Sequence, residues 1–574
     1  MPGIPTAHPE PGSTQERSTV TSSARSVPAG TPLGDTFHVY DTTLRDGAQR
    51  EGISYSVTDK LAVARLLDGL GVGFIEGGWP GAMPKDTEFF ARAAAGELQL
   101  RHAALVAFGS TRRAGTTAAQ DPQVRGLLDS QAPVITLVAK SDRRHIERAL
   151  RTDVAEAEAM VRDTVAFLVG EGRRVFLDAE HFFDGYAFDP DTSLRVLTAA
   201  MESGADVAVL CDTNGGQLPL GLAETVGEVI ARTGFRVGIH CQDDTSCAVA
   251  NSVAAVQAGA SHVQCTANGY GERAGNADLF AVIGNLVTKL GIDALPTGAL
   301  AELTRVSHAL AEIANIAPDT HQAYVGSSAF AHKAGLHASA IKVDPVLYNH
   351  LDPGTVGNDM RVLVTEMAGR ASLELKGHEL GVDLAGRPEA VTNALRKVKD
   401  LEARGWSFEA ADASFELLLR EEIAGLDPTQ SEPVTPFELE SYRVILDHDR
   451  DGSVVSEATV KVRVGGQRVI ATAEGNGPVH ALDAALRTAL SPHLPWLDEV
   501  ELTDYKVRIL TSGGGPRGTD HGTDAVTRVL VQSSDREREW TTVGVHGNIV
   551  EASWLALCDA LAHKAMRVRA AVSG

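Results

Sequence analysis

The stretch Tyr40-Asp41-Thr42-Thr43-Leu44-Arg45-Asp46-Gly47-Ala48-Gln49 joins a strand-like apolar run to a turn. The run covers residues 37–44. Arg45 and Asp46 follow it, and a glycine comes directly after them. A carboxylate at a strand end can bind a divalent metal, and a guanidinium beside it can stabilise negative charge on a substrate oxygen. A lone Arg–Asp pair is more often a surface ion pair, so this interpretation depends on what the other strands carry.

Similar apolar runs rich in β-branched residues recur along the first half of the chain, separated by helix-like Ala/Leu/Arg/Glu segments. The eight runs are Phe37–Leu44, Val72–Gly77, His102–Phe108, Val134–Ala139, Arg174–Ala179, Asp206–Cys211, Arg236–His240 and His262–Thr266. Continuous apolar runs that alternate with helices are typical of a parallel sheet buried on both faces. The count of eight favours a closed (β/α)₈ TIM barrel over an open doubly wound sheet.

The chain of 574 residues is too long for one ordinary domain. Residues 1–35 are rich in Pro, Ser, Thr and Gly and predict a disordered tail. We expect the barrel over residues 36–290 and a mainly helical linker subdomain over 291–434. The alternating strand Ser456–Val464 and later helical patterns predict a separate C-terminal α+β domain over 435–574.

The composition excludes several classes of partner. Fifty-two basic residues against 75 acidic ones give a net charge of −23, which argues against nucleic acid or an anionic membrane as the main partner. No run of 18 apolar residues occurs, so a membrane span is not expected. The five cysteines follow no pattern and indicate reduced thiols in a cytoplasmic protein.

Polar residues gather where the predicted strands end, and such ends converge on one face of a barrel. They are Arg45, Asp46, Glu76, Lys140, Asp178, Glu180, His181, Asp212, Thr213, His240, Gln242, Asp244 and Asn268, followed by the loop Gly269–Ala277. His240 and Gln242 lie two apart on a strand and so face the same side. With Asp46 and Asn276 they form a possible metal site, whose oxygens suit Mg²⁺ or Mn²⁺ better than Zn²⁺, although Zn²⁺ is possible.

These segments resemble a known family. Tyr40–Gln49, Ile75–Gly81, Asp178–Gly185, Cys211–Gly216 and Asn268–Ala277 are similar to the acyl-CoA-condensing DRE-TIM metalloenzymes, the 2-isopropylmalate, homocitrate and citramalate synthases. Within the group, the Gly-Gly-Trp-Pro-Gly turn most resembles the citramalate synthases. The resemblance implies a Claisen-type condensation of acetyl-CoA with pyruvate to (R)-citramalate, the entry to isoleucine synthesis from pyruvate.

The same resemblance assigns roles to individual residues. Asp46, His240 and Asn276 would ligate the metal, Arg45 would stabilise the alkoxide, and Thr213 would hold the substrate carboxylate. We count Glu76 with Arg45 and Thr213 as substrate-binding. Glu180 would lie near the acetyl group, and His337, in the linker region, would deprotonate the acetyl methyl and complete the site of a neighbouring subunit.

One position departs from the family pattern His-x-His-Asn-Asp. Here the sequence reads His240-Cys241-Gln242-Asp243-Asp244, so an amide replaces the second imidazole. Gln242 can still ligate through its carbonyl oxygen, and we expect a shift from Zn²⁺ toward Mg²⁺ or Mn²⁺. The alternatives are an enzyme for another short 2-keto acid, as in 2-isopropylmalate synthase, a carbon–carbon lyase, and a metabolite-binding pseudoenzyme without metal.

The C-terminal domain resembles the regulatory domain of the same synthases in Ala473–Val479 and Asn548–Trp554. The resemblance implies a homodimer or higher homo-oligomer and inhibition by a branched-chain amino acid, isoleucine for a citramalate enzyme. A helix N-terminus after a glycine-rich turn can receive a carboxylate, which makes such a site physically reasonable. A purely structural oligomerisation domain is the alternative.

Overall fold

The structure is a computed structural model that describes residues 36–333, 335–365, 367–426, 435–448, 450, 452–510 and 525–573. The chain divides into two compact units, residues 1–318 and 319–574, which are described one at a time. The tail predicted over residues 1–35 lies outside the described residues. In the described part, no helix combines the length and the apolar character that crossing a membrane requires.

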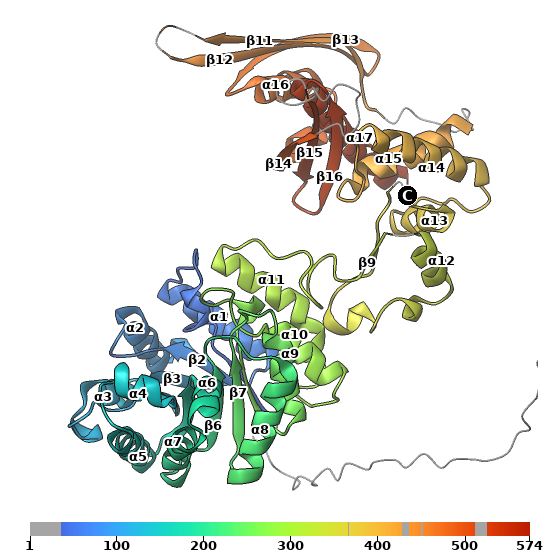
Figure 1. The fold of residues 1–574 in the computed structure, drawn as a ribbon. Helices are drawn as coiled ribbons and strands as arrows, with labels where there is room; N and C mark the ends of the chain where they lie inside the picture. The colour runs from blue at the N-terminus through green and yellow to red at the C-terminus, as the bar shows by residue number, and fades with distance from the viewer. Residues whose placement is uncertain are drawn as a thin grey trace, which may run out of the picture. The chain divides into compact units, whose positions relative to one another are not determined.

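The first unit is a closed barrel of eight parallel strands, which confirms the predicted fold class (Figure 1). Neighbouring strands pair in chain order, and β1 closes the ring by pairing with β8. Each predicted run overlaps the observed strand. The strands are β1 (His38–Asp41), β2 (Phe74–Gly78), β3 (Ala104–Ser110), β4 (Val134–Lys140), β5 (Arg174–Glu180), β6 (Val207–Asp212), β7 (Val237–Cys241) and β8 (His262–Cys265).

Helices follow the strands and surround the barrel (Figure 1). The first begins at a capping box, in which the Ser56 hydroxyl accepts from the Asp59 N–H and the Asp59 carboxylate accepts from the Ser56 N–H. It ends at Gly71, whose left-handed backbone a glycine adopts without strain. The helices of this unit are α1 (Val57–Leu70), α2 (Pro84–Arg92), α3 (Pro122–Asp129), α4 (Arg143–Arg148), α5 (Val154–Gly170), α6 (Phe182–Phe188), α7 (Pro190–Glu202), α8 (Pro219–Thr233), α9 (Ala248–Gln257), α10 (Leu279–Thr288) and α11 (Leu303–Ala314).

The barrel interior combines an aromatic layer with a polar rim. Tyr40, Phe74 and Phe176 pack against one another, and their ring centroids lie 5.2–6.2 Å apart. The parallel register aligns the carboxyl ends of neighbouring strands, so that Lys140 lies opposite Glu180 and Asp212 opposite Cys241. The polar residues at those ends therefore share one rim, where barrel enzymes build their active sites.

The second unit begins with a mainly helical segment. It contains a short two-stranded parallel sheet and four α-helices among the described residues. The elements are β9 (Ala331–His332), α12 (Gly335–Val343), β10 (Arg361–Val362), α13 (Arg370–Glu379), α14 (Pro388–Ala403) and α15 (Asp412–Leu426).

The C-terminal part repeats one pattern twice, three antiparallel strands followed by a helix. The first set is β11 (Glu438–His448), β12 (Val454–Val464), β13 (Gln467–Gly475) and α16 (Pro478–Leu490). The second set is β14 (Glu501–Leu510), β15 (Val526–Ser534), β16 (Glu539–His546) and α17 (Ile549–Ser573). A common core joins the two sets, because Val460 and Leu486 of the first pack in one cluster with Trp540 and Trp554 of the second.

Helix α15 is packed onto this C-terminal part rather than lying free in the linker. Phe415 shares a buried cluster with Val543 of β16. The Ser414 hydroxyl donates to Asp559 of α17 over 2.6 Å, and His563 lies 3.0 Å from Glu416. These polar and apolar contacts tie the end of the helical segment to β16 and α17.

Candidate active site

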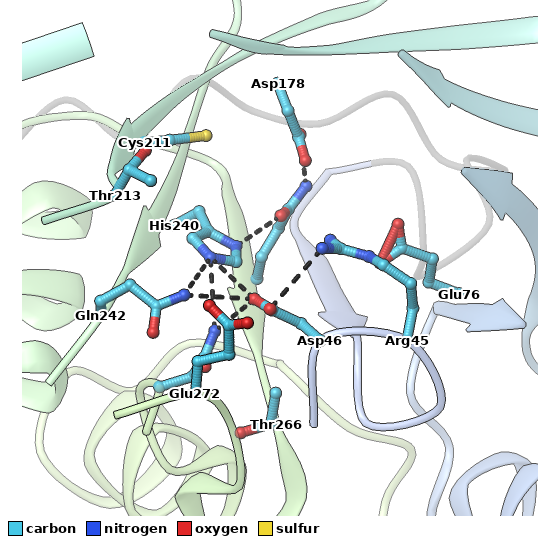
Figure 2. A network of polar contacts seen from close by, with 12 residues as sticks. Arg45, Asp46, Glu76, Asp178, Cys211, Thr213, His240, Gln242, Thr266 and Glu272 are labelled. Atoms are coloured by element: carbon cyan, nitrogen blue, oxygen red, sulfur yellow. Dashed lines mark hydrogen bonds and ion pairs between the residues drawn. The ribbon is translucent and has the colours of Figure 1, made fainter. Parts of the chain in front are cut away.

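Backbone pairing brings the proposed metal ligands together at the rim. Asp46 follows β1 in a turn in which the N–H groups of Arg45, Asp46 and Gly47 all donate to the Thr42 carbonyl. Gln242 follows β7 and forms an isolated antiparallel bridge with Asn276. The loop after β8 is therefore held against the end of β7, and both face Asp46 (Figure 2).

One carboxylate oxygen is the centre of the cluster. Asn276 Nδ2 donates to Asp46 Oδ2 over 2.7 Å, and Gln242 Nε2 donates to the same oxygen over 3.3 Å. His240 Nε2 lies 3.2 Å from it (Figure 2). All four side chains are buried, with 4–6% of their surface exposed. The structure thus brings together the four residues that the sequence predicts as ligands.

The charges of this cluster favour an ionised Asp46. Burial opposes ionisation, but the Arg45 guanidinium and the hydrogen bond from His240 outweigh it and hold the pKa of Asp46 below its usual value. Burial likewise opposes a charge on His240, yet its hydrogen bond to Asp46 raises its pKa. The site presents an anionic oxygen that attracts a positive charge, whether a proton on His240 or a cation.

Arg45 is held rigidly beside this cluster. Its Nε donates to Glu76 Oε2 over 3.1 Å, its Nη2 lies 3.0 Å from the same oxygen, and its Nη1 lies 3.6 Å from Asp46 Oδ1. The guanidinium stacks over Phe108, 3.9 Å from the ring centroid. Burial raises the pKa of Glu76 to about 7, although the Arg45 charge opposes the rise. One oxygen of Glu76, Oε2, contacts Arg45, whereas the other, Oε1, is buried without a hydrogen-bond partner.

Thr213 and Glu180 lie at the ends of two further strands. The Thr213 hydroxyl accepts from the backbone N–H of His181 over 2.9 Å, and His181 adopts the left-handed conformation with φ of 58°. Because the hydroxyl oxygen is already engaged as an acceptor, its own hydrogen can be donated to an anion. Glu180 forms an ion pair with Lys140 of the neighbouring strand and is about a quarter exposed.

These groups line one cavity of about 610 Å³. Its lining includes Arg45, Asp46, Glu180, Thr213 and His240. A volume of this size is within the usual range for small-molecule sites. Polar groups of opposite charge therefore face a common space at the carboxyl ends of the strands.

His337 is the predicted site residue that belongs to the second unit. It lies on α12, and its ring centroid is 4.2 Å from that of Tyr348. The structure brings the other predicted residues together within the barrel, whereas the role of His337 stays a prediction.

The donor atoms of the cluster decide which metal it could hold. Among the described residues, no group of three or more His, Cys, Asp and Glu side chains could hold a metal ion. Asp46 and His240 are complemented instead by two amides, and Gln242 Oε1 and Asn276 Oδ1 are buried oxygens without a hydrogen-bond partner. Rotating an amide group by half a turn exchanges its oxygen and nitrogen. Both amide oxygens can therefore face a cation bound at Asp46. This donor set fits a hard divalent cation.

Sequence reasoning missed Gln264, which contacts His240 directly. Gln264 Oε1 lies 2.8 Å from His240 Nδ1, and the residue is almost fully buried in the barrel interior. The available signal was the alternation of the polar residues His262 and Gln264 with the apolar residues Val263 and Cys265 along β8. Its significance depends on the pairing of β7 with β8, which places Gln264 opposite His240.

Comparison with known proteins agrees with this architecture. Residues 36–310 match the HMGL-like family model, and residues 324–405 match the homocitrate synthase post-HMGL domain-like model. Residues 409–565 match the LeuA allosteric (dimerisation) domain. These matches follow the order of barrel, helical segment and α+β part.

Similar proteins extend over nearly the whole chain. A Streptomyces coelicolor protein named (R)-citramalate synthase is 60% identical over 94% of this chain and 98% of its own length. Proteins of the same name from Synechocystis and Aquifex aeolicus are 47% and 44% identical, over 91% and 93% of this chain and 95% and 99% of their own lengths. The chain belongs to the (R)-citramalate synthase family, within the HMGL-like enzymes.

Proposed function

We propose that the protein condenses acetyl-CoA with pyruvate to give (R)-citramalate and CoA, with a divalent cation held at Asp46. The observation that carries this proposal is the convergence of Asn276, Gln242 and His240 on one oxygen of Asp46, beside Arg45. Family membership supports a condensing enzyme of this type. The cation, the two substrates and the place in isoleucine synthesis belong to the proposal.

Asp46, His240, Gln242 and Asn276 would hold the cation. When bound, it would supply a Lewis acid that polarises the ketone of the keto acid. Three oxygens and one imidazole favour Mg²⁺ or Mn²⁺, because hard cations prefer oxygen ligands, while Zn²⁺ prefers nitrogen and sulfur. Gln242 adds no charge to the site, and its amide oxygen would bind the cation more weakly than the imidazole of the family pattern does.

Arg45 would stabilise the negative charge that develops on the ketone oxygen. Its guanidinium is fixed before substrate binds, by Glu76 on one side and the Phe108 ring on another. A preorganised donor of this kind requires no reorganisation during the reaction. Glu76 would thus act on the substrate site through Arg45, as the residue that holds the guanidinium in place.

Thr213 would orient the keto acid by donating its hydroxyl hydrogen to the carboxylate. The Thr213 oxygen accepts from the His181 N–H, which leaves its own hydrogen available to donate to that carboxylate. This arrangement is a fixed donor for an anion at the rim of the cavity.

The reaction also needs a base for the acetyl methyl group. We assign this proton transfer to His337 contributed by a neighbouring subunit, with Glu180 near the acetyl group and Lys140 holding the Glu180 carboxylate. Loss of the methyl proton gives the enolate, whose carbon bonds to the keto carbon of pyruvate, and the alkoxide that forms takes up a proton to become the hydroxyl of the product. Water then cleaves the thioester and releases CoA.

The C-terminal part would regulate this chemistry. The match to the LeuA allosteric (dimerisation) domain supports a homodimer or higher homo-oligomer and a branched-chain amino-acid effector, for which we propose isoleucine. Measuring the rate with isoleucine, leucine and valine separately tests the effector, and inhibition by isoleucine alone is expected. The five free cysteines are consistent with the cytoplasmic location that we propose.

The deciding experiment is CoA release from acetyl-CoA by metal-stripped protein that is resupplied with Mg²⁺, Mn²⁺ or Zn²⁺. Pyruvate, 2-oxobutyrate, 2-oxoisovalerate and 2-oxoglutarate are compared at each metal. The proposal requires the fastest release with pyruvate and Mg²⁺ or Mn²⁺. Fastest release with 2-oxoisovalerate would instead support a 2-isopropylmalate-type enzyme, and no release with any keto acid would support a pseudoenzyme.

A further inference from the structure

A chain of two hydrogen bonds crosses the barrel behind the proposed metal site. Gln264 Oε1 lies 2.8 Å from His240 Nδ1, and Gln264 Nε2 donates to Asp178 Oδ1 over 2.8 Å. Figure 2 labels Asp178 and His240 and marks these two contacts between them with dashed lines. The three side chains come from β5, β7 and β8 and are 1–6% exposed, so water does not compete for these contacts.

The strand register explains why Gln264 can make this bridge. It lies opposite His240 on β7 and opposite Tyr40 on β1, so it occupies the same layer of the barrel as both. Its neighbours Val263 and Cys265 point to the other face of β8, because side chains alternate along a strand. The Gln264 side chain therefore extends across the interior toward Asp178.

The chemistry of the three groups fixes the direction of each hydrogen bond. An ionised Asp178 only accepts, so Gln264 presents its NH₂ group to it, as in the observed hydrogen bond. Its carbonyl oxygen must then face His240, and that oxygen can only accept. His240 Nδ1 therefore carries a hydrogen, and Nε2, the nitrogen 3.2 Å from Asp46, is the one free to exchange its proton for a cation.

We propose that Gln264 is a positioning residue that sets the tautomer and ring orientation of His240, and that Asp178 in turn sets the orientation of the Gln264 amide. The inference rests on the proposed cation site at Asp46. Partners of this kind behind a metal-binding histidine commonly change metal affinity 10–100-fold when they are removed.

The test is Mn²⁺ binding by the full-length protein, measured by titration calorimetry without substrates. Gln264→Leu is expected to weaken Mn²⁺ binding about 10–100-fold. Asp178→Asn is expected to weaken Mn²⁺ binding less. The introduced amide can either accept from Gln264 or donate to it, so the Gln264 amide can take either of two orientations. The control is Thr136→Val, which removes the hydrogen bond between Thr136 and Tyr40 in the same barrel interior and should leave Mn²⁺ binding unchanged.

A double variant separates orientation from packing. Gln264→Glu with Asp178→Asn exchanges the carboxylate and the amide, keeps the total charge, and still offers His240 Nδ1 an acceptor. Mn²⁺ binding should return close to that of the unaltered protein. Wild-type binding in both single variants, or no recovery in the stable double variant, would overturn the proposal.

A readout that needs no metal distinguishes this inference from the proposed function. In metal-free protein labelled with nitrogen-15 histidine, at a pH where His240 is neutral, its Nδ1 should carry the hydrogen. Subtracting the spectrum of a His240→Gln variant identifies the signal. Gln264→Leu should give a mixture of tautomers, and an unchanged spectrum would contradict the role of Gln264 even if the wild-type protein binds no Mn²⁺.

Discussion

Asn276 Nδ2 donates to Asp46 Oδ2 over 2.7 Å, although 230 positions separate the two residues along the chain. Asp46 follows the first strand and Asn276 follows the eighth, and β1 pairs with β8 to close the barrel. Closure of the ring therefore assembles the proposed cation site. Any change that opens the pairing of β1 and β8 should also disrupt that site.

Asp46→Asn should abolish measurable Mg²⁺ and Mn²⁺ binding and CoA release. The amide removes the only anionic ligand of the proposed set, and cation binding depends on that charge. Calorimetry and the CoA assay check both outcomes. Asp59→Asn, which neutralises a carboxylate in the exposed cap of α1, is the control and should cost only about 1 kcal/mol of stability. Metal binding in Asp46→Asn equal to that of the control would exclude Asp46 as a ligand.

Gln242→His should shift the metal preference toward Zn²⁺. The change replaces a hard oxygen donor by an imidazole and gives two nitrogen ligands, which favours Zn²⁺ over Mg²⁺. We expect the ratio of Zn²⁺ to Mg²⁺ affinity to rise about 10-fold or more. Competitive titration with both metals measures this ratio. An unaltered ratio would place Gln242 outside the ligand shell. The matched variant is Gln242→Leu, which supplies no ligand atom and should lower the affinity for both metals.

Gly78→Ala should destabilise the barrel by about 2–3 kcal/mol. Gly78 has a φ of +133°, and a Cβ there would meet the Asp86 carboxylate, which is buried and pairs with Lys60. Both the backbone conformation and the ion pair would have to change. Thermal unfolding checks this, with Gly69→Ala in α1 as control. A Cβ at Gly69 meets no atom within 4 Å, so that variant should be neutral or stabilised.

Acid should destabilise the barrel through a buried histidine pair. His38 Nδ1 lies 3.1 Å from His262 Nδ1, and burial, aided by the charges of Arg236 and Arg174, lowers the pKa of His38 to about 2. Burial also lowers the pKa of His262 well below its usual value. The folded protein keeps both rings neutral, whereas the unfolded chain binds protons below pH about 6.5.

This pair therefore contributes full stability above pH about 6.5 and loses it as the pH falls, by up to about 1.4 kcal/mol per pH unit for each ring. The midpoint of thermal unfolding should drop between pH 7 and pH 5. The double variant His38→Gln/His262→Gln has no imidazole to titrate here and should lose less of its midpoint over that range. Parallel pH curves for the two proteins would contradict the assignment.

Much of the fold follows from local sequence pattern. The apolar runs of the barrel strands are continuous because both faces of a parallel sheet are buried, and β4 begins at Val134 and β5 at Arg174, where their predicted runs begin. Convergence of Asp46, His240 and Asn276 follows in turn, since strand ends in a barrel share one rim.

Side-chain pairing across the barrel could not be predicted in the same way. The hydrogen bond from Gln264 to Asp178 joins β8 to β5, and no local pattern fixes which interior residues meet. The direction of the Gln242 amide is another such detail, because it depends on how Asp46 and Asn276 are held. Position in a strand predicts which face a residue occupies, but not its partner on that face.

The most direct test of the account is anomalous diffraction from a crystal soaked with Mn²⁺ and pyruvate. The account predicts one manganese peak bonded to Asp46 and His240, with the amide oxygens of Gln242 and Asn276 turned toward it and pyruvate beside Arg45. Water alone at that position, with both amide nitrogens still on Asp46, would contradict the proposed cation site.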